Sequence, residues 1–145
     1  MWILKKFNEL NLQELYNIMR IRQQVFMVEQ KCYYVDADNI DQPSFHLMYF
    51  QDKNLVAYSR IIPPSALYDE PSIGRVVTHS SVRGTGLGKI LFQKSIDETE
   101  KLFEKCPIKI MAQSYLIKFY QGFGFEVTSE EFLEDGIAHN YMVRG

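Results

Sequence analysis

The stretch SVRGTGLGKIL, residues Ser81 to Leu91, decides the fold of this chain. Three glycines stand on alternate positions between Arg83 and Lys89, and an apolar run follows. Because glycine has no Cβ, a phosphate can come close to the backbone here. The first N–H groups of a helix and its dipole attract the same anion. The stretch therefore predicts a phosphate-binding turn that leads into a helix.

Two known phosphate-binding patterns do not fit this segment. A P-loop needs a hydroxyl after its lysine, but Ile90 stands there, and the spacing from Gly84 to Gly88 is one residue too short. The dinucleotide fingerprint needs GxGxxG directly after a strand, and the preceding strand ends too far upstream. A third pattern, Arg-x-x-Gly-x-Gly, is met by Arg83, Gly86 and Gly88. A glycine-rich connection without any ligand is the alternative that this segment alone leaves open.

The composition is typical of a single domain over residues 1–145. Hydrophobic residues make up 46% of the chain and the formal net charge is −2, so a substantial core is expected. We find no basic stripe with interleaved aromatic residues, so no nucleic-acid partner is expected. No apolar stretch is long enough to cross a membrane, so no membrane partner is expected. The aromatic content is also compatible with a homodimer.

The cysteine and acidic residues do not form a recognisable metal site. Cys32 and Cys106 lie outside any CxxC pattern, which favours buried free thiols and a cytoplasmic location. The run from Asp36 to Asp41 departs from a calcium loop, because Ile40 and Asp41 replace its ligand and glycine. We therefore expect no metal.

Hydrophobic periodicity and turn residues predict an α/β fold. A capping box at Asn11 and Glu14 is expected to open the first helix. The predicted strands cover residues 2–7, 45–50, 55–62, 72–78, 108–113, 126–128 and 139–143. The predicted helices begin at residue 12 and cover 20–30, 87–103 and 115–121.

Two motifs together resemble the GNAT N-acetyltransferase superfamily. The first is the acetyl-CoA signature Arg83-x-x-Gly86-x-Gly88 after a strand, and the second is Tyr120 four residues before Gly124. Longer runs resemble the ElaA-like branch, and the resemblance extends from about residue 15 to residue 142. These runs are 22–30, 58–60, 73–76, 112–116 and 134–139. The family often has Asn where this chain has Gln113, a modest departure.

The resemblance implies a single GNAT-like domain and a specific chemistry. Its central mixed, mostly antiparallel, twisted sheet would have six to seven strands, splayed between the fourth and fifth, with about four flanking helices. Acetyl-CoA would donate its acetyl group to the amine of a small molecule, such as an amino acid or a polyamine, by direct attack in a ternary complex. The implied acetyl-CoA site comprises Val76, Val77, Thr78, Arg83, Gly84, Thr85, Gly86, Leu87, Gly88, Lys89, Gln113 and Tyr120.

Within that site the resemblance assigns two catalytic tasks. The backbone N–H groups of the fourth strand, at Val77 above all, would polarise the thioester carbonyl. The Tyr120 hydroxyl would serve the departing thiolate. An ammonium group cannot attack, so the acceptor must lose a proton, for which Glu70 is the expected base. Other titratable residues leave this assignment open: Glu29, His46, His79 and His139.

The acceptor pocket is expected on the first helices and their loop. Its candidate residues are Phe26, Glu29, Gln30, Tyr33, Arg60 and Arg75. The two arginines fit two roles, namely pairing with a substrate carboxylate or forming a buried ion pair with Glu29 or an aspartate of the loop. Two other functions remain open: a non-catalytic acyl-CoA-binding regulatory module, and an enzyme like the acylhomoserine-lactone synthases.

Overall fold

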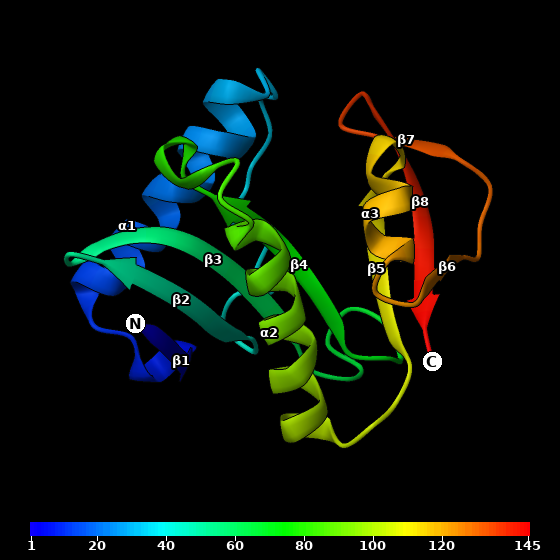
Figure 1. Ribbon diagram of the computed structural model, residues 1–145, viewed down its shortest axis with the longest axis horizontal. Helices are drawn as coiled ribbons and strands as arrows, with labels where there is room; N and C mark the ends of the chain where they lie inside the picture. Colours follow the sequence, from blue (N-terminus) through cyan, green and yellow to red (C-terminus); the bar gives the residue numbers. More distant parts are fainter.

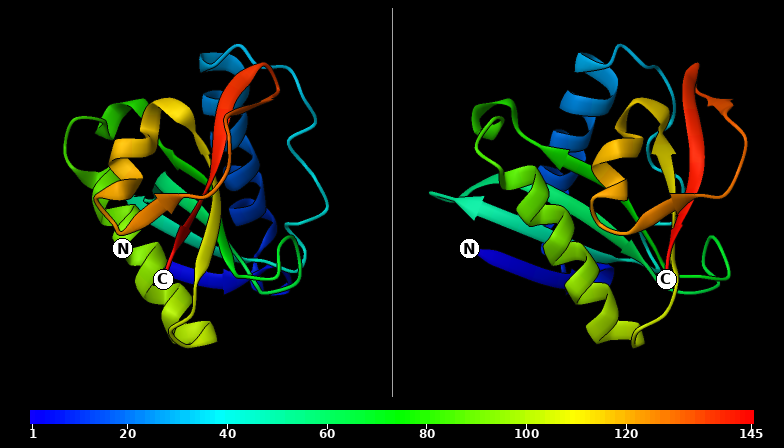
Figure 2. Two further views of the ribbon diagram at one scale, coloured as in Figure 1. Left: turned by 90° about the vertical axis from the view of Figure 1, so that its right-hand side faces the viewer. Right: turned by 45° about the vertical axis from the view of Figure 1, so that its right-hand side comes forward.

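The strands of the N-terminal half form one antiparallel sheet in the computed structural model, which describes residues 1–145 (Figure 1). Their order in the sheet is β1-β2-β3-β4. The strands are β1 (Trp2–Lys6), β2 (Phe45–Gln51), β3 (Asn54–Ile62) and β4 (Ser72–Thr78). Helices α1 (Leu12–Arg22) and α2 (Leu87–Phe103) cover opposite faces of this sheet (Figure 2). Tyr58 packs toward α1 and its neighbour Ala57 toward α2, so β3 is buried on both faces.

The C-terminal half forms a second antiparallel sheet around the long strand β8 (Figure 1). Its strands are β5 (Ile108–Gln113), β6 (Phe125–Val127), β7 (Phe132–Glu134) and β8 (Ile137–Arg144). β5 lies along one side of β8, and the short β6 and β7 both pair with β8 as well. The short helix α3 (Ile117–Gln121) and α2 close the core over this sheet, where Phe92 and Phe125 are fully buried.

The prediction of one mixed sheet of six to seven strands with about four helices is therefore wrong in its details. The structure has two four-stranded sheets and three α-helices, and every strand pair is antiparallel. The two sheets separate between β4 and β5, where no ladder forms. A backbone hydrogen bond of 3.0 Å, from Lys109 N to Pro71 O, joins the chain at the base of this separation. The splay predicted between the fourth and fifth strands is therefore present as a complete separation of β4 from β5.

The expected second helix over residues 20–30 is a continuation of α1 with a wider turn. Residues Gln23–Glu29 form the π-helix η2, and backbone bonds run from Gln30 N to Val25 O and from Cys32 N to Met27 O. Such bonds span five residues instead of four, and π-turns are frequent at functional sites. Periodicity does not distinguish this turn from an α-helix, so the prediction missed it.

Several local predictions are confirmed. Asn11 Oδ1 accepts a hydrogen bond from Glu14 N, and the Glu14 carboxylate accepts one from Asn11 N, which completes the capping box. The bounds of β4, α2 and β5 agree with the predicted ranges. Cys32 and Cys106 are free, but they are half-buried and not buried as expected. None of the helices has the length and apolar character that a bilayer crossing requires.

Candidate functional site

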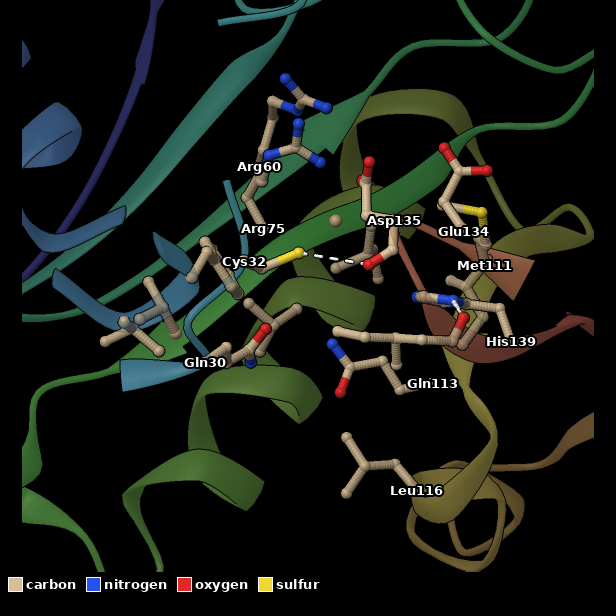
Figure 3. Close-up of a pocket in the computed structure, with 18 of the residues that line it drawn as sticks. Gln30, Cys32, Arg60, Arg75, Met111, Gln113, Leu116, Glu134, Asp135 and His139 are labelled. Atoms are coloured by element: carbon tan, nitrogen blue, oxygen red, sulfur yellow. Dashed lines mark hydrogen bonds between the residues drawn. The ribbon is translucent and has the colours of Figure 1, made fainter. Parts of the chain in front are cut away.

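A cavity of about 950 Å³ lies where the two sheets separate (Figure 3). One wall consists of β4 from Ile73 to Thr78, and the opposite wall of Ile110, Met111 and Gln113 on β5. Residues of η2, the loop after it and strand β8 close the remaining sides. A cavity of this volume, formed by segments far apart in sequence, is typical of a small-molecule or cofactor site.

Strand β4 carries a β-bulge in the cavity wall. Tyr58 pairs with Val77 and Arg60 with Gly74, so Ser59 of β3 faces both Arg75 and Val76. Arg75 has a φ of 48°, a left-handed conformation that is uncommon for a residue with a side chain. A bulge leaves the ladder locally unpaired. The backbone of β4 can therefore offer hydrogen-bond donors to a ligand in the cavity.

The glycine segment forms a tight turn at the start of α2. Gly84 and Gly86 have φ values of 78° and 86°, and Gly86 is the N-cap of the 17-residue helix. Both conformations favour glycine, and no neighbouring atom lies where a Cβ would project at either position. The Arg83 guanidinium donates to Thr78 O and pairs with Glu29 at 2.6 Å. The turn is therefore open to an anion, and Arg83 lies beside it.

Tyr120 on α3 lines the cavity from the side of the second sheet. Its ring packs against Phe92 and Phe119, with centroid distances of 5.1 Å and 5.3 Å. Burial, with a smaller contribution from Tyr115, raises the pKa of Tyr120 to about 12. The hydroxyl is therefore protonated at neutral pH and can donate a hydrogen bond into the cavity. Gln113, at the end of β5, lines the same wall.

Two acidic residues, Glu134 and Asp135, lie at another side of the cavity (Figure 3). The Cys32 thiol donates to the backbone carbonyl of Asp135 at 3.4 Å, which joins the loop after η2 to the turn between β7 and β8. Glu134, the last residue of β7, and Asp135, on that turn, have no salt-bridge partner. Phe26, Glu29 and Gln30 extend from η2 and its end. The sequence indicated only a turn at residues 134–136, so its place at the cavity was missed.

His139 of β8 is the histidine that lines this cavity. Its side chain is almost buried, and its Nδ1 lies 2.7 Å from the Ile137 carbonyl oxygen. Because a carbonyl can only accept, Nδ1 carries the proton in the neutral ring. Nε2 is then the nitrogen left to accept a proton.

Three arginines and three aspartates form a charged network at one side of the cavity, which Arg60, Arg75 and Asp38 line. Arg22 pairs with Asp36 and Asp41, each at 2.7 Å, and its side chain is 0% exposed. The remaining pairs are Arg60 with Asp38 and Asp41, and Arg75 with Asp36 and Asp38. Of the two alternatives left open for Arg60 and Arg75, the structure thus shows the ion pair with loop aspartates.

This network also determines the ionisation of its members. Burial acts to raise the pKa of Asp38, but hydrogen bonds and the charge of Arg60 outweigh it and lower that pKa to about 2. Burial likewise opposes ionisation of Asp41, and its bonds to Arg22 and Arg60 still lower its pKa. All three arginines therefore face ionised carboxylates at neutral pH. Separately, the structure contains no group of three or more His, Cys, Asp or Glu side chains that could hold a metal ion.

Some predicted residues lie away from the cavity. Glu70 belongs to the loop before β4 and does not line it, and Tyr33 is 87% exposed. His46 is buried between Tyr58 and the Asp41 carbonyl, and His79 bonds to Ser81 near the glycine turn. None of these four residues is among those that line the cavity.

A second cavity of about 610 Å³ lies between α2 and α3, next to the glycine turn. Three lysines and one aspartate contribute its charge, namely Lys89, Lys94, Lys118 and Asp97, and Ile90 and Phe119 contribute apolar surface. Lys94 pairs with Glu98 at 3.4 Å, whereas Lys89 and Lys118 form no salt bridge. The groove is thus positively charged where it meets the turn.

Comparison with known proteins identifies the family of this fold and site. Residues 11–144 match the acetyltransferase (GNAT) domain. The chain belongs to the GNAT family. A UPF0039 protein of Synechocystis is 36% identical over 98% of this GNAT chain and 93% of its own length. The ElaA protein of Escherichia coli is 34% identical over 94% of the chain and 91% of its own length.

Solved structures agree with this assignment. The crystal structure of an acyl-CoA N-acyltransferase from Pseudomonas aeruginosa matches this GNAT fold with a TM-score of 0.95 and 37% identity, covering 100% of this chain and 99% of that one. The structure of E. coli ElaA gives a TM-score of 0.93 and 33% identity over the same shares of the two chains. The resemblance to the ElaA-like branch is thereby confirmed.

Proposed function

We propose that this GNAT protein is an N-acetyltransferase that transfers the acetyl group of acetyl-CoA to a small amine. The observation that carries the proposal is the cavity between β4 and β5, into which the β4 bulge faces from one side and Tyr120 from the other. A thioester placed between them would meet donors for its carbonyl oxygen and for its leaving sulfur. The glycine turn at the start of α2 supports the presence of a phosphate-bearing donor.

The two cavities together suit the length and chemistry of CoA. Its pantetheine arm would lie between β4 and β5, where Val76, Val77, Thr78 and Gln113 are the proposed contacts. The pyrophosphate would bind the turn from Arg83 to Lys89. The nucleotide would then reach the groove between α2 and α3, where Lys89 and Lys118 have no carboxylate partner. An ammonium group is a point charge well suited to the 3′-phosphate.

The proposed reaction uses these groups in one transfer. His139 Nε2 takes a proton from the acceptor ammonium, and the free amine attacks the thioester carbon. The carbonyl oxygen gains negative charge, which the N–H groups of β4 stabilise. The C–S bond then breaks, and the amide and CoA thiolate leave. The nitrogen gives up its second proton to water, and water protonates the thiolate. His139 then releases its proton to solvent and returns to the neutral form.

The role of Tyr120 in this scheme is to donate a hydrogen bond. An ordinary thiol has a pKa of about 8.5, well below the pKa of about 12 of this phenol. Full proton transfer from Tyr120 to the thiolate would therefore be unfavourable. A hydrogen bond to the developing negative charge on sulfur lowers the barrier without that transfer.

The acceptor is proposed to be cationic. Arg60, Arg75 and Arg83 are each paired with acids, so they do not attract a substrate carboxylate strongly. Glu134 and Asp135, at the mouth of the cavity, lack such partners. This balance supports an amine with a second positive charge, as in polyamines, or an amine on a short chain.

Release of free CoA thiol from acetyl-CoA tests the function directly. The acceptor panel would contain amino acids, polyamines, aminoglycosides and lysine peptides, with S-adenosylmethionine and longer acyl-CoA donors to test a lactone-synthase activity. Acceptor-dependent release, strongest with polyamines, is the expected result. Tight CoA binding by calorimetry with every acceptor silent would favour a non-catalytic binding module. Absence of CoA binding would overturn the proposal.

A further inference from the structure

We propose that Arg75 is a positioning residue whose ion pairs hold the β4 bulge in the shape that polarises the thioester. The inference rests on the proposed function, because it concerns the same carbonyl-binding backbone. The sequence suggested that Arg75 binds the substrate, and the proposed role is a different one.

The bulge needs an anchor because its backbone is unfavourable for arginine. A φ of 48° places the Cβ of Arg75 close to neighbouring backbone atoms, and residues with side chains adopt this conformation rarely. Such a conformation persists when the surrounding contacts enforce it. Without them, β4 would relax toward regular pairing with β3, and the N–H groups that face the cavity would turn.

The Arg75 side chain makes contacts that can enforce this conformation. Its Nε donates to Asp36 Oδ1 at 2.8 Å, and its Nη2 donates to the Asp36 backbone oxygen at 3.1 Å. Nη2 also lies 3.3 Å from Asp38 Oδ2, and the guanidinium is 6.0 Å from the centroid of the Tyr34 ring. The carboxylate and the backbone carbonyl of Asp36 thus hold the guanidinium in a fixed orientation.

Asp36, the residue that Arg75 contacts, is itself held in place. Asp36 is 7% exposed, and Arg22 Nε donates to its other carboxylate oxygen at 2.7 Å while Arg22 Nη2 bonds to its backbone oxygen. Arg22 ends α1 and is fully buried. A chain of contacts therefore runs from α1 through Asp36 to Arg75 and the bulge. Displacement of the loop that carries Asp36 would displace the carbonyl-binding backbone as well.

The test separates backbone shape from side-chain chemistry. Arg75→Ala removes the anchor and disfavours positive φ, whereas Arg75→Gly and Arg75→Asn remove the anchor but tolerate it. Each full-length variant would be saturated with [1-¹³C]acetyl-CoA, and the carbonyl ¹³C chemical shift would report polarisation of the thioester. Calorimetry with acetyl-CoA and thermal melting would report binding and folding separately.

The expected result is a graded loss of polarisation. Wild-type protein should displace the carbonyl signal from its position in free acetyl-CoA, Arg75→Ala should return it nearly to that position, and the Gly and Asn variants should lie between. Binding should persist in all of them. Glu100→Gln, which breaks the Arg144–Glu100 ion pair away from the cavity, is the matched control and should keep the wild-type signal.

Several outcomes would overturn the inference. A wild-type signal in Arg75→Ala would mean that the anchor is not needed, and equal loss in all three variants would assign the effect to the guanidinium itself. If Arg75→Ala unfolds, Arg75→Gln replaces it, because glutamine keeps a Cβ at the positive φ and lacks the charge that forms the ion pairs. A wild-type signal in Arg75→Gln would then overturn the inference. Failure of the wild-type protein to bind acetyl-CoA would instead overturn the proposed function, which distinguishes the two failures.

Discussion

At the scale of single residues, the most informative group is the Tyr120 hydroxyl. Burial, in a site where its ring packs against Phe92 and Phe119, raises its pKa to about 12, so the hydroxyl stays protonated well above physiological pH. We predict that Tyr120→Phe lowers kcat by about 10- to 10²-fold, since a hydrogen bond to a charged group contributes about 1.5–3 kcal/mol. The Kd of acetyl-CoA should hardly change, because the bond forms fully only as the thiolate develops.

Thiol-release kinetics and calorimetry on the same samples would check this prediction. Tyr16→Phe is a suitable control, since Tyr16 is an exposed residue of α1 far from the cavity. A variant with full kcat would exclude Tyr120 from the departure of the thiolate. Weaker binding of acetyl-CoA with an unchanged kcat would mean that Tyr120 only packs against the pantetheine arm.

The base is a second question at this scale. His139 lines the cavity with Nε2 available, whereas Glu70 does not line it. We predict that His139→Gln lowers kcat/KM by about 10²-fold, a typical contribution of general-base catalysis. Glu70→Gln, measured in parallel, tests the base that the sequence suggested. Loss of activity in Glu70→Gln alone would contradict the assignment of His139.

At the scale of elements, the groove between α2 and α3 has a testable role. If Lys89 and Lys118 bind the 3′-phosphate of CoA, wild-type protein should bind acetyl-CoA more tightly than acetyl-dephospho-CoA, which lacks that group. The double variant Lys89→Met/Lys118→Met should bind both donors equally, with a loss of about 10-fold for acetyl-CoA. Calorimetry on the two donors measures both effects.

The matched control for the groove is Lys105→Met, which removes one lysine beyond the end of α2 and outside the groove. It should leave the preference for acetyl-CoA intact. A double variant that still prefers acetyl-CoA would place the nucleotide elsewhere. Weaker binding of both donors to the same extent would indicate a general electrostatic effect instead of phosphate recognition.

The elements with strong local signals were the ones predictable from sequence. The capping box at Asn11 and the glycine turn before α2 each depend on residues close together in the chain, and both are present. The π-turn of η2 differs from an α-helix by a shift of one hydrogen-bond partner, which leaves the apolar pattern unchanged. Strand β7 has three residues and exists through its pairing with β8, so periodicity did not reveal it.

At the scale of the whole molecule, the sequence predicted a splay between the fourth and fifth strands, but not the complete separation into two sheets or the extent of the charged network. Both depend on contacts between distant residues: Arg22 and Arg75 meet at Asp36 although they lie on α1 and β4. The sequence offered Arg60 and Arg75 either as substrate-binding residues or as partners of Glu29 or a loop aspartate, and it gave Arg22 no such role. The structure shows the ion pairs with the loop aspartates and adds Arg22 to them.

The network has a consequence for the stability of the whole protein. The pKa of Asp38 is about 2 in the folded chain and about 3.9 for an unfolded aspartate, so its ionised form stabilises the fold. This contribution is complete above about pH 4 and is lost as the pH falls through about 2. Burial also lowers the pKa of His46, so the folded chain keeps this ring neutral at a pH where an unfolded histidine binds a proton. Protonation of the unfolded chain therefore reduces the free energy of unfolding as the pH falls below about 6.5, the pKa of an unperturbed imidazole.

We therefore predict that the free energy of unfolding declines steadily from neutral pH toward acid, with Asp38 responsible for the most acidic part. Urea denaturation across this range would measure the decline in wild type and in Asp38→Asn. At neutral pH the variant should be less stable by about 1 kcal/mol, because the Arg60 bonds lose a charged partner while solvent at the exposed Asp38 screens part of that loss. Near pH 2 most of the difference should be lost, since wild-type Asp38 is then about half protonated in the folded chain. A difference that stays constant across the range would mean that Asp38 stabilises the fold by packing and not by charge.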